Sequence, residues 1–190
     1  MTEFDVPTTV QDRLLSEARI GNFGLANSGE AEPVSVDVVR TADVEREVSR
    51  YADGSISVLE SEIPTEVDPG AAAPRAITGC TVVSGSGFKN FSGCRIHYQS
   101  HIFSYGFYAD YMYGNGGWDQ IYRAYDQFQG YAIGHSRDSW ALKVIKQHES
   151  STGPAHAQLS IVYNVLPAFG QVTKGVRLKV GGDRSWQENS

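Results

Sequence analysis

The strongest constraint on the fold is a strict alternation of side chains over residues 102–113. One face of this segment would carry apolar and aromatic residues, namely Phe103, Tyr105, Phe107, Ala109, Tyr111 and Tyr113. The other face would be mixed, with Ile102, Ser104, Gly106, Tyr108, Asp110 and Met112. Because side chains of a strand point alternately to its two faces, the pattern predicts a half-buried β-strand.

Similar but shorter patterns recur along the chain. Further strands are predicted at 34–40, 80–84, 94–99, 120–128, 140–145, 155–163 and 176–180, and a hairpin at 44–63 turns at Asp53-Gly54. Segment 120–128 also fits helical spacing. The 20 glycines and 10 tyrosines suit sheets joined by tight turns. We therefore expect an all-β fold, an antiparallel β-sandwich with an N-terminal β-hairpin and a short helix in an extended N-terminal arm. An open barrel would give much the same pattern.

The N-terminal third is organised differently. Residues 7–20 predict a short helix capped by Thr8, with Gln11 as the partner in a capping box. Residues 21–33 have the composition of a linker with little to bury. Prolines and small residues make 64–75 a spacer. We expect four parts: an acidic arm at 1–43, a hairpin and Pro-rich spacer at 44–75, a disulfide-stapled sandwich at 76–182 and a flexible polar tail at 183–190.

Charge is distributed unevenly. Residues 1–70 carry 15 acidic and 5 basic side chains, a balance of −10, whereas residues 71–190 carry 7 acidic and 11 basic ones, a balance of +4. The basic residues form no cluster, which argues against nucleic acid as a partner. No apolar run reaches the length of a membrane span. The acidic first ten residues have no apolar segment typical of a signal peptide, so an exported form would have lost its leader.

The two cysteines flank a Gly-rich turn. Cys80 and Cys94 lie at opposite ends of the segment TVVSGSGFKNFSG. This placement favours a small-loop disulfide, which would indicate an oxidising compartment. The alternative is a pair of reduced, buried thiols in a cytosolic protein.

Patterns of catalytic or metal-binding residues are weak. His97 and His101 lie four apart, a distance of about 13 Å on a strand, too far for one metal ion unless the chain turns between them. The serines of the Gly-rich turn lack the context of a nucleophile elbow. Asp110 interrupts an aromatic strand and is the most interesting carboxylate, although the simpler explanation is that it faces solvent on the mixed side of that strand. We predict no catalytic residue, no metal site and no cofactor, and hence no enzyme.

Aromatic residues carry the best functional signal. Six exceed what one core needs to bury, namely Tyr98, Tyr108, Trp118, Tyr122, Tyr125 and Tyr131. Exposed Tyr and Trp can stack on sugar rings or anchor a protein partner. The binding residues we predict are Tyr108, Asp110, Trp118, Tyr122 and Tyr125. The acidic arm is a second candidate, because such a segment can fold back or add a strand to a partner's sheet.

The segment from RYADGSISV through IPTEV and AAPRAITGC to the second cysteine resembles a group of uncharacterised secreted proteins of actinomycetes. These proteins combine a YADGS hairpin, a Pro-containing spacer, a Cys-to-Cys turn and a Ser/Tyr-rich β domain. The resemblance covers roughly residues 45–182. It implies export, a disulfide and a β-sandwich, and it implies no activity.

Together these features predict a secreted, extracellular binding module or a subunit of an extracellular assembly, non-catalytic, that recognises a protein or a glycan. Two alternatives remain. One is a secreted antibacterial, bacteriocin-like toxin with residues 1–75 as a neutralising arm. The other is a carbohydrate-active enzyme that uses Asp110.

Overall fold

The computed structural model describes residues 1–29, 31–68, 79–165 and 170–190. The chain begins with the 3-10 helix η1 (Thr2–Phe4), the α-helix α1 (Thr8–Arg19) and the 3-10 helix η2 (Leu25–Asn27). Across the described ranges the strands are β1 (Ser35–Arg40), β2 (Val44–Arg50), β3 (Ile56–Glu62), β4 (Thr65–Glu66), β5 (Thr81–Gly85), β6 (Phe88–Ser100), β7 (Phe103–Tyr113), β8 (Gln120–Ala132), β9 (His135–Lys146), β10 (Ala155–Val165), β11 (Gln171–Val180) and β12 (Ser185–Asn189). None of the described helices is long and apolar enough to cross a membrane.

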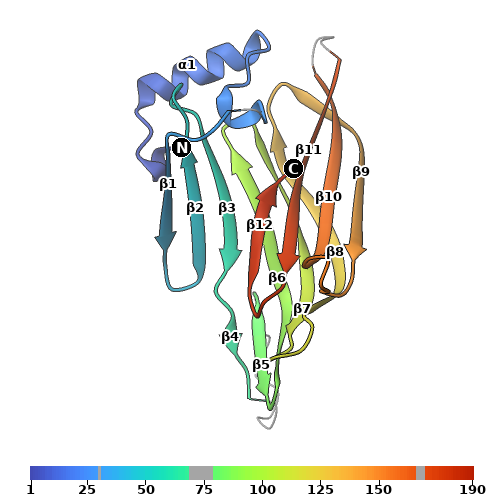
Figure 1. The fold of residues 1–190 in the computed structure, drawn as a ribbon. Helices are drawn as coiled ribbons and strands as arrows, with labels where there is room; N and C mark the ends of the chain where they lie inside the picture. Colours follow the sequence, from blue (N-terminus) through green and yellow to red (C-terminus); the bar gives the residue numbers. More distant parts are fainter. Residues whose placement is uncertain (30, 69–78, 166–169) are drawn as a thin grey trace.

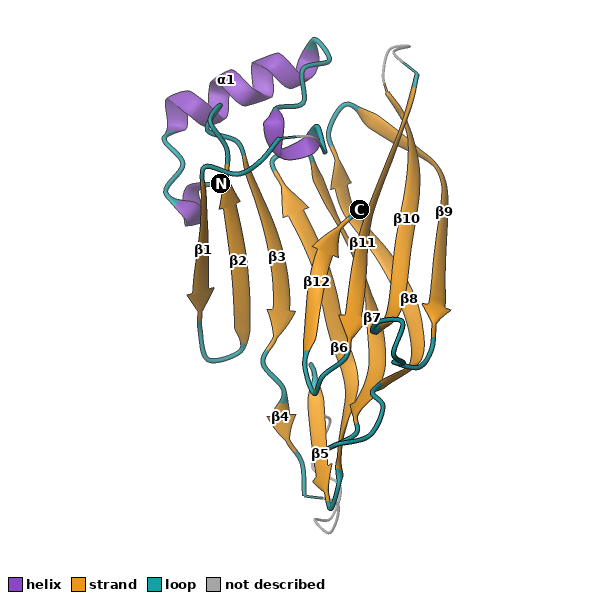
Figure 2. Cartoon of the chain, viewed as in Figure 1, coloured by secondary structure: helices purple, strands orange, loops and turns teal. Residues whose placement is uncertain are grey.

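The strands form a sandwich of two sheets, which confirms the predicted all-β class (Figures 1 and 2). Sheet A contains β1 to β8, and sheet B has the order β12-β11-β10-β9. The long strand β6 organises sheet A. One of its edges pairs with β7, which in turn pairs with β8, and its other edge is shared by β3 and β5. Among the described strands, all pairs are antiparallel except the short pair of β4 with β5.

The main core lies between the two sheets. Alternation over residues 102–113 places Phe103, Tyr105 and Phe107 inward, each at most 1% exposed, as predicted. Across from them, every second residue of β10 is fully buried, including Leu159 and Ile161. Each face is apolar because it packs on the other sheet, so the period-two pattern follows from the two-layer architecture.

Tyr98 belongs to this core, contrary to its prediction as a surface aromatic. It is 1% exposed, and its ring stacks on that of Tyr105 at a centroid distance of 5.0 Å. Its hydroxyl donates to the carbonyl oxygen of Ala26 at 3.3 Å. A buried tyrosine needs such a partner, and here the N-terminal segment supplies it.

The predicted disulfide is confirmed. Cys80 precedes β5, Cys94 lies on β6, and the bond joins positions 14 residues apart in the sequence. Both cysteines are 3% exposed and belong to the main core. The bond therefore ties the β5–β6 hairpin at the position where its two strands separate.

The N-terminal helix is present as predicted, with a different cap. Pro7 is the N-cap residue and makes no side-chain capping bond. The amide of Gln11 donates instead to the carbonyl oxygen of Val6 at 2.7 Å, so the capping box with Thr8 is wrong. Leu14 is fully buried, as expected for a helix that is stable only when docked.

In the segment predicted as a linker, described residues of the range 21–29 are more buried than expected. Within them η2 lies at the end of the sandwich, with Ala26 at 2% and Asn27 at 7% exposure. The hydroxyl of Ser100 donates to Oδ1 of Asn27 at 2.9 Å, and Nζ of Lys174 donates to its carbonyl oxygen. The prediction missed this burial because the contacts come from strands more than 70 residues away.

The hairpin predicted at 44–63 is confirmed as β2 and β3, but its turn is longer than two residues. Arg50 pairs with Ile56, so five residues form the loop. Gly54 has a positive φ of 76°, whereas Asp53 does not. The carboxylate of Asp53 accepts hydrogen bonds from the backbone of Ser55 and Leu25 at 3.0 and 2.8 Å, which ties the loop to η2.

The C-terminal segment predicted as a flexible tail contains the strand β12. Within the predicted tail, β12 pairs along β11 and completes that side of sheet B. Gln187 of β12 donates to the carbonyl oxygen of Glu60 in β3 at 2.7 Å. The predicted boundary at residue 75 falls outside the described residues, and β3 on one side of it pairs with β6 on the other.

Candidate functional site

β8 carries four aromatic side chains at intervals of three residues: Tyr122, Tyr125, Phe128 and Tyr131. We call these four residues the aromatic row. In a regular strand, side chains three residues apart point to opposite faces. Three register shifts of β8 against β7 change this, because each shift inserts one extra residue on β8.

The pairing with β7 places the row on the outer face of sheet A, the face turned away from sheet B. Tyr125 is opposite Tyr108, Phe128 opposite Gly106, and Tyr131 opposite Ser104. These β7 partners alternate with the residues that point into the core, so they and their β8 partners share the outer face. Tyr122 is the extra residue at the third shift, and its hydroxyl lies 3.1 Å from Oδ1 of Asn90 on β6.

The local sequence of β8 permits two of the shifts. Asp126 has a φ of 48°, in the left-handed region that Asp tolerates better than most residues. At Gly130, an added Cβ would lie 2.8 Å from the hydroxyl oxygen of Ser104. Both positions therefore allow β8 to bulge without steric conflict, and the bulges bring aromatic residues to one face.

The tyrosine hydroxyls of the row are anchored on the neighbouring strands. Tyr125 donates to Oδ1 of Asp110 at 3.1 Å, and Tyr131 donates to the carbonyl oxygen of Ser100 at 2.6 Å. Burial raises the pKa of both phenols. Anchored hydroxyls restrict the rotamers of the rings, so less conformational entropy is lost when a ligand packs on them.

Asp110 accepts hydrogen bonds from residues of two neighbouring strands, β6 and β8. It is 8% exposed, and its carboxylate accepts bonds from the backbone N–H of Gly93 at 2.8 Å and from the Arg123 side chain. Gly93 sits at the register shift of β6 and has a φ of 69°. Both carboxylate oxygens have partners, so the side chain holds three strands together.

Phe128 lies over β7 because Gly106 has no side chain. A Cβ at Gly106 would approach Cζ of Phe128 to 2.7 Å. The ring also lies 6.0 Å from that of Tyr108 and 5.6 Å from that of His97, measured between centroids. An aromatic ring packed over a glycine on the neighbouring strand is a stabilising cross-strand contact.

A charged cluster on β2, β3 and β6 borders the row. Glu60, whose side chain is 8% exposed, pairs with Arg46 at 2.6 Å and with Arg95. The His97 ring, 3.6 Å from the carboxylate, and these two guanidinium groups hold the pKa of Glu60 at about 2. The same face has a cavity of about 510 Å³ between Tyr108 and the acidic residues Asp43 and Glu62.

The structure brings together four of the five predicted binding residues: Tyr108, Asp110, Tyr122 and Tyr125. Trp118 lies on neither strand but in the loop between β7 and β8, with 60% of its surface exposed. The prediction missed Phe128 and Arg123. The three-residue spacing of aromatic residues in β8 could have indicated Phe128, but that spacing also fitted a helix.

No protein-family model matches the chain, and no curated protein matches it significantly. A search of solved structures matches a hypothetical protein, lmo2686 from Listeria monocytogenes EGD-e, with a TM-score of 0.42 and 15% sequence identity. The match covers 78% of this chain and 94% of that protein.

Proposed function

We propose that this protein is an extracellular, non-catalytic binding module that recognises a glycan through the aromatic row. The observation that carries the proposal is the placement of four aromatic side chains on one sheet face, in a single line along β8. A line of rings suits an extended polymer, because successive units of the ligand can pack on successive rings.

The groups around the row support the choice of a sugar as ligand. Arg123, with 65% of its side chain exposed, lies between Tyr122 and Tyr125 and packs over the Tyr125 ring at 4.4 Å. Charged and amide groups beside apolar rings can bond hydroxyls while the rings cover the apolar faces of a sugar. The Cys80–Cys94 disulfide supports an oxidising compartment, and hence an extracellular location.

The hydrogen bonds that the Asp110 carboxylate accepts support a binding role for this protein over a catalytic one. A general acid or base needs a carboxylate that can exchange a proton with a substrate. In this structure Gly93, Arg123 and Tyr125 occupy its oxygen atoms, and the side chain is buried. These contacts favour a structural role for Asp110 beneath the binding face.

Binding of the full chain to immobilised polysaccharides, including cell-wall glycans, tests the proposal. For a glycan that binds, Tyr122→Ala and Phe128→Ala should each raise Kd about tenfold, or about 1.4 kcal/mol. Trp118→Ala is the matched control, since Trp118 is exposed but outside the row. Circular dichroism would verify the fold of each variant. Absence of binding to every glycan, or equal loss of affinity in the Trp118 variant, would overturn the proposal.

A further inference from the structure

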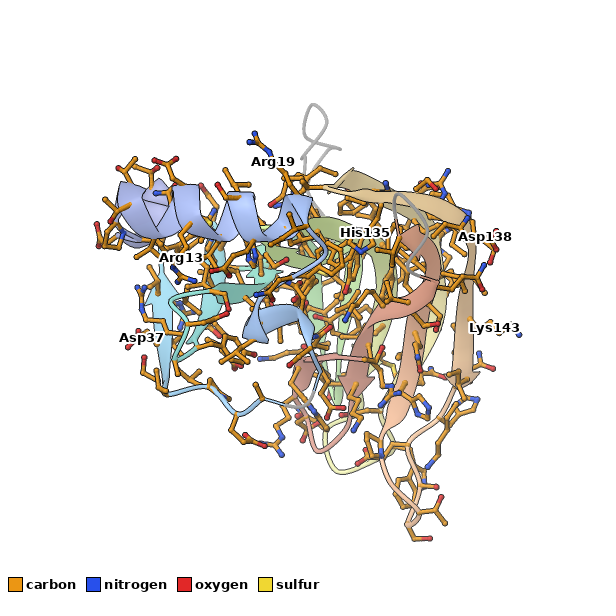
Figure 3. All side chains as sticks on the ribbon, turned by 90° about the horizontal axis from the view of Figure 1, so that it is seen from above. Arg13, Arg19, Asp37, His135, Asp138 and Lys143 are labelled. Atoms are coloured by element: carbon orange, nitrogen blue, oxygen red, sulfur yellow. A yellow bond between two sulfur atoms is a disulfide. The ribbon has the colours of Figure 1, made fainter. Side chains whose placement is uncertain are left out.

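The edge strand β1 presents an unusually exposed apolar surface. Among the described residues, β1 pairs only with β2, in six consecutive pairs without a register shift. All six residues of β1 are exposed, including Val36 at 50%, Val38 at 64% and Val39 at 45%. Figure 1 shows β1 and β2 beyond the edge of sheet B, and Figure 3 shows Asp37 at the rim of the molecule.

This edge lacks the features that usually prevent strand pairing. Natural edge strands are protected by bulges, by proline or by charges directed into a partner's path. β1 has no bulge and no internal proline. Its two charged residues are already paired with β2, Asp37 with Arg50 at 3.2 Å and Arg40 with Glu45 at 3.8 Å.

The hydrogen-bond phase of β1 determines which backbone groups face outward. The N–H of Thr41 donates to the carbonyl oxygen of Val44 at 2.9 Å, so this pair is hydrogen-bonded. Bonding alternates along an antiparallel ladder, and therefore the odd-numbered residues of β1 bond to β2. The N–H and C=O groups of Val36, Val38 and Arg40 consequently point to the open edge.

We propose that β1 pairs antiparallel with β1 of a second copy of this chain, with Val38 of both copies on the two-fold axis. In a symmetric pair, outward-facing residues must oppose one another to exchange hydrogen bonds. Two registers meet this condition and pair five residues of β1 in each copy. One is centred on Asp37 and the other on Val38. The first places two carboxylates directly opposite each other, which is unfavourable.

The register centred on Val38 places no like charges directly opposite each other. Val38 packs on its copy, and Val36 lies against the aliphatic stem of Arg40 from the other copy. Asp37 lies opposite Val39, and no like charges oppose each other. A second copy is chosen as the occupant because, in this one register, the open backbone groups of both strands meet, Val38 packs on Val38, and no like charges are opposed.

The dimer has a consequence for ligand binding, which rests on the proposed function. A two-fold axis normal to the sheet joins both copies of sheet A edge to edge and keeps both outer faces on the same side. The two aromatic rows would then face one ligand surface. Two linked sites bind a polymer more tightly than either one does, by effective concentration alone.

Sedimentation equilibrium of the full chain tests the dimer independently of any glycan. The wild-type protein should sediment as a dimer, and Val38→Lys, which places two ammonium groups on the axis, should sediment as a monomer. Ile145→Lys is the matched control, because Ile145 is 55% exposed on β9 and should leave the dimer intact. A wild-type monomer at every accessible concentration would overturn the proposal and leave the edge to a strand of another protein.

Single cysteines test the register. Oxidation should cross-link Val38→Cys into a covalent dimer, because the two residues face each other across the axis. Val36→Cys should remain uncross-linked, since the two copies of residue 36 would be about 13 Å apart. The native cysteines are already bonded to each other and do not compete. Equal cross-linking at both positions, or a dimer that persists in Val38→Lys, would exclude this register.

Discussion

The hydroxyl of Tyr125 on β8 donates to Oδ1 of Asp110 on β7 at 3.1 Å. The same oxygen accepts the backbone N–H of Gly93, at the register shift of β6. One buried carboxylate therefore links an irregular position of β6 to the aromatic residue at the centre of the row. This relationship connects the stability of sheet A with the geometry of the candidate binding face.

Replacement of Asp110 should destabilise the protein. In Asp110→Ala, the N–H of Gly93 and the hydroxyl of Tyr125 lose their acceptor, which should cost about 1–3 kcal/mol. The free energy of unfolding, measured with urea, would show the loss. Arg123→Ala is the control, because an exposed partner of an ion pair contributes little to stability. Equal stability of Asp110→Ala and the wild type would contradict the structural role.

Glu60 should make stability depend on pH in the acid range. Its pKa is lowered from 4.5 to about 2 in the folded protein. A depressed carboxylate pKa stabilises the fold above pH 4.5, and this contribution, up to about 3 kcal/mol, is lost as the pH falls toward 2.

Urea unfolding of Glu60→Gln across this pH range would measure the effect. The variant should be less stable at pH 7, because Arg46 and Arg95 lose their partner. Its stability should nevertheless fall less steeply than that of the wild type between pH 4.5 and 2. Parallel curves for the two proteins would show that the depressed pKa belongs to another group.

His101 should also make the stability of the fold depend on pH, in a higher pH range than Glu60 does. The ring is 5% exposed, and burial lowers its pKa below the ordinary value of 6.5, although Asp53 and Glu17 act in the opposite direction. Because the charged form is disfavoured in the fold, stability should fall as the pH drops below 6.5. His101→Gln should show a smaller decrease in urea midpoint between pH 7 and 5. An unchanged decrease would assign the effect to the other histidines.

The disulfide should contribute to stability through the unfolded state. Cys80 and Cys94 close a loop with a sequence separation of 14, which corresponds to about 3 kcal/mol in the chain-entropy model. The Cys80→Ser, Cys94→Ser double variant should lose about that amount in urea unfolding. A midpoint equal to that of the wild type would show that the bond adds no net stability.

The sequence predicted the strands with regular alternation and part of the site. Residues 102–113, 155–163 and 176–180 show the two-residue period of a strand with one buried face, and their faces follow from sequence alone. Tyr108 and Asp110 were assigned to the mixed face correctly, since each lies within a single uninterrupted alternation. The cysteine pair was also predicted, because loop length and turn composition are local properties.

Tertiary structure decided the rest. The aromatic row shares one face only because β8 bulges three times against β7, and the register of two strands cannot be read from one of them. The burial of η2 and the pairing of β12 depend on partners far away in the sequence. A local pattern determines which side of a strand is apolar, but only packing between distant strands determines where that side lies and which residues join it.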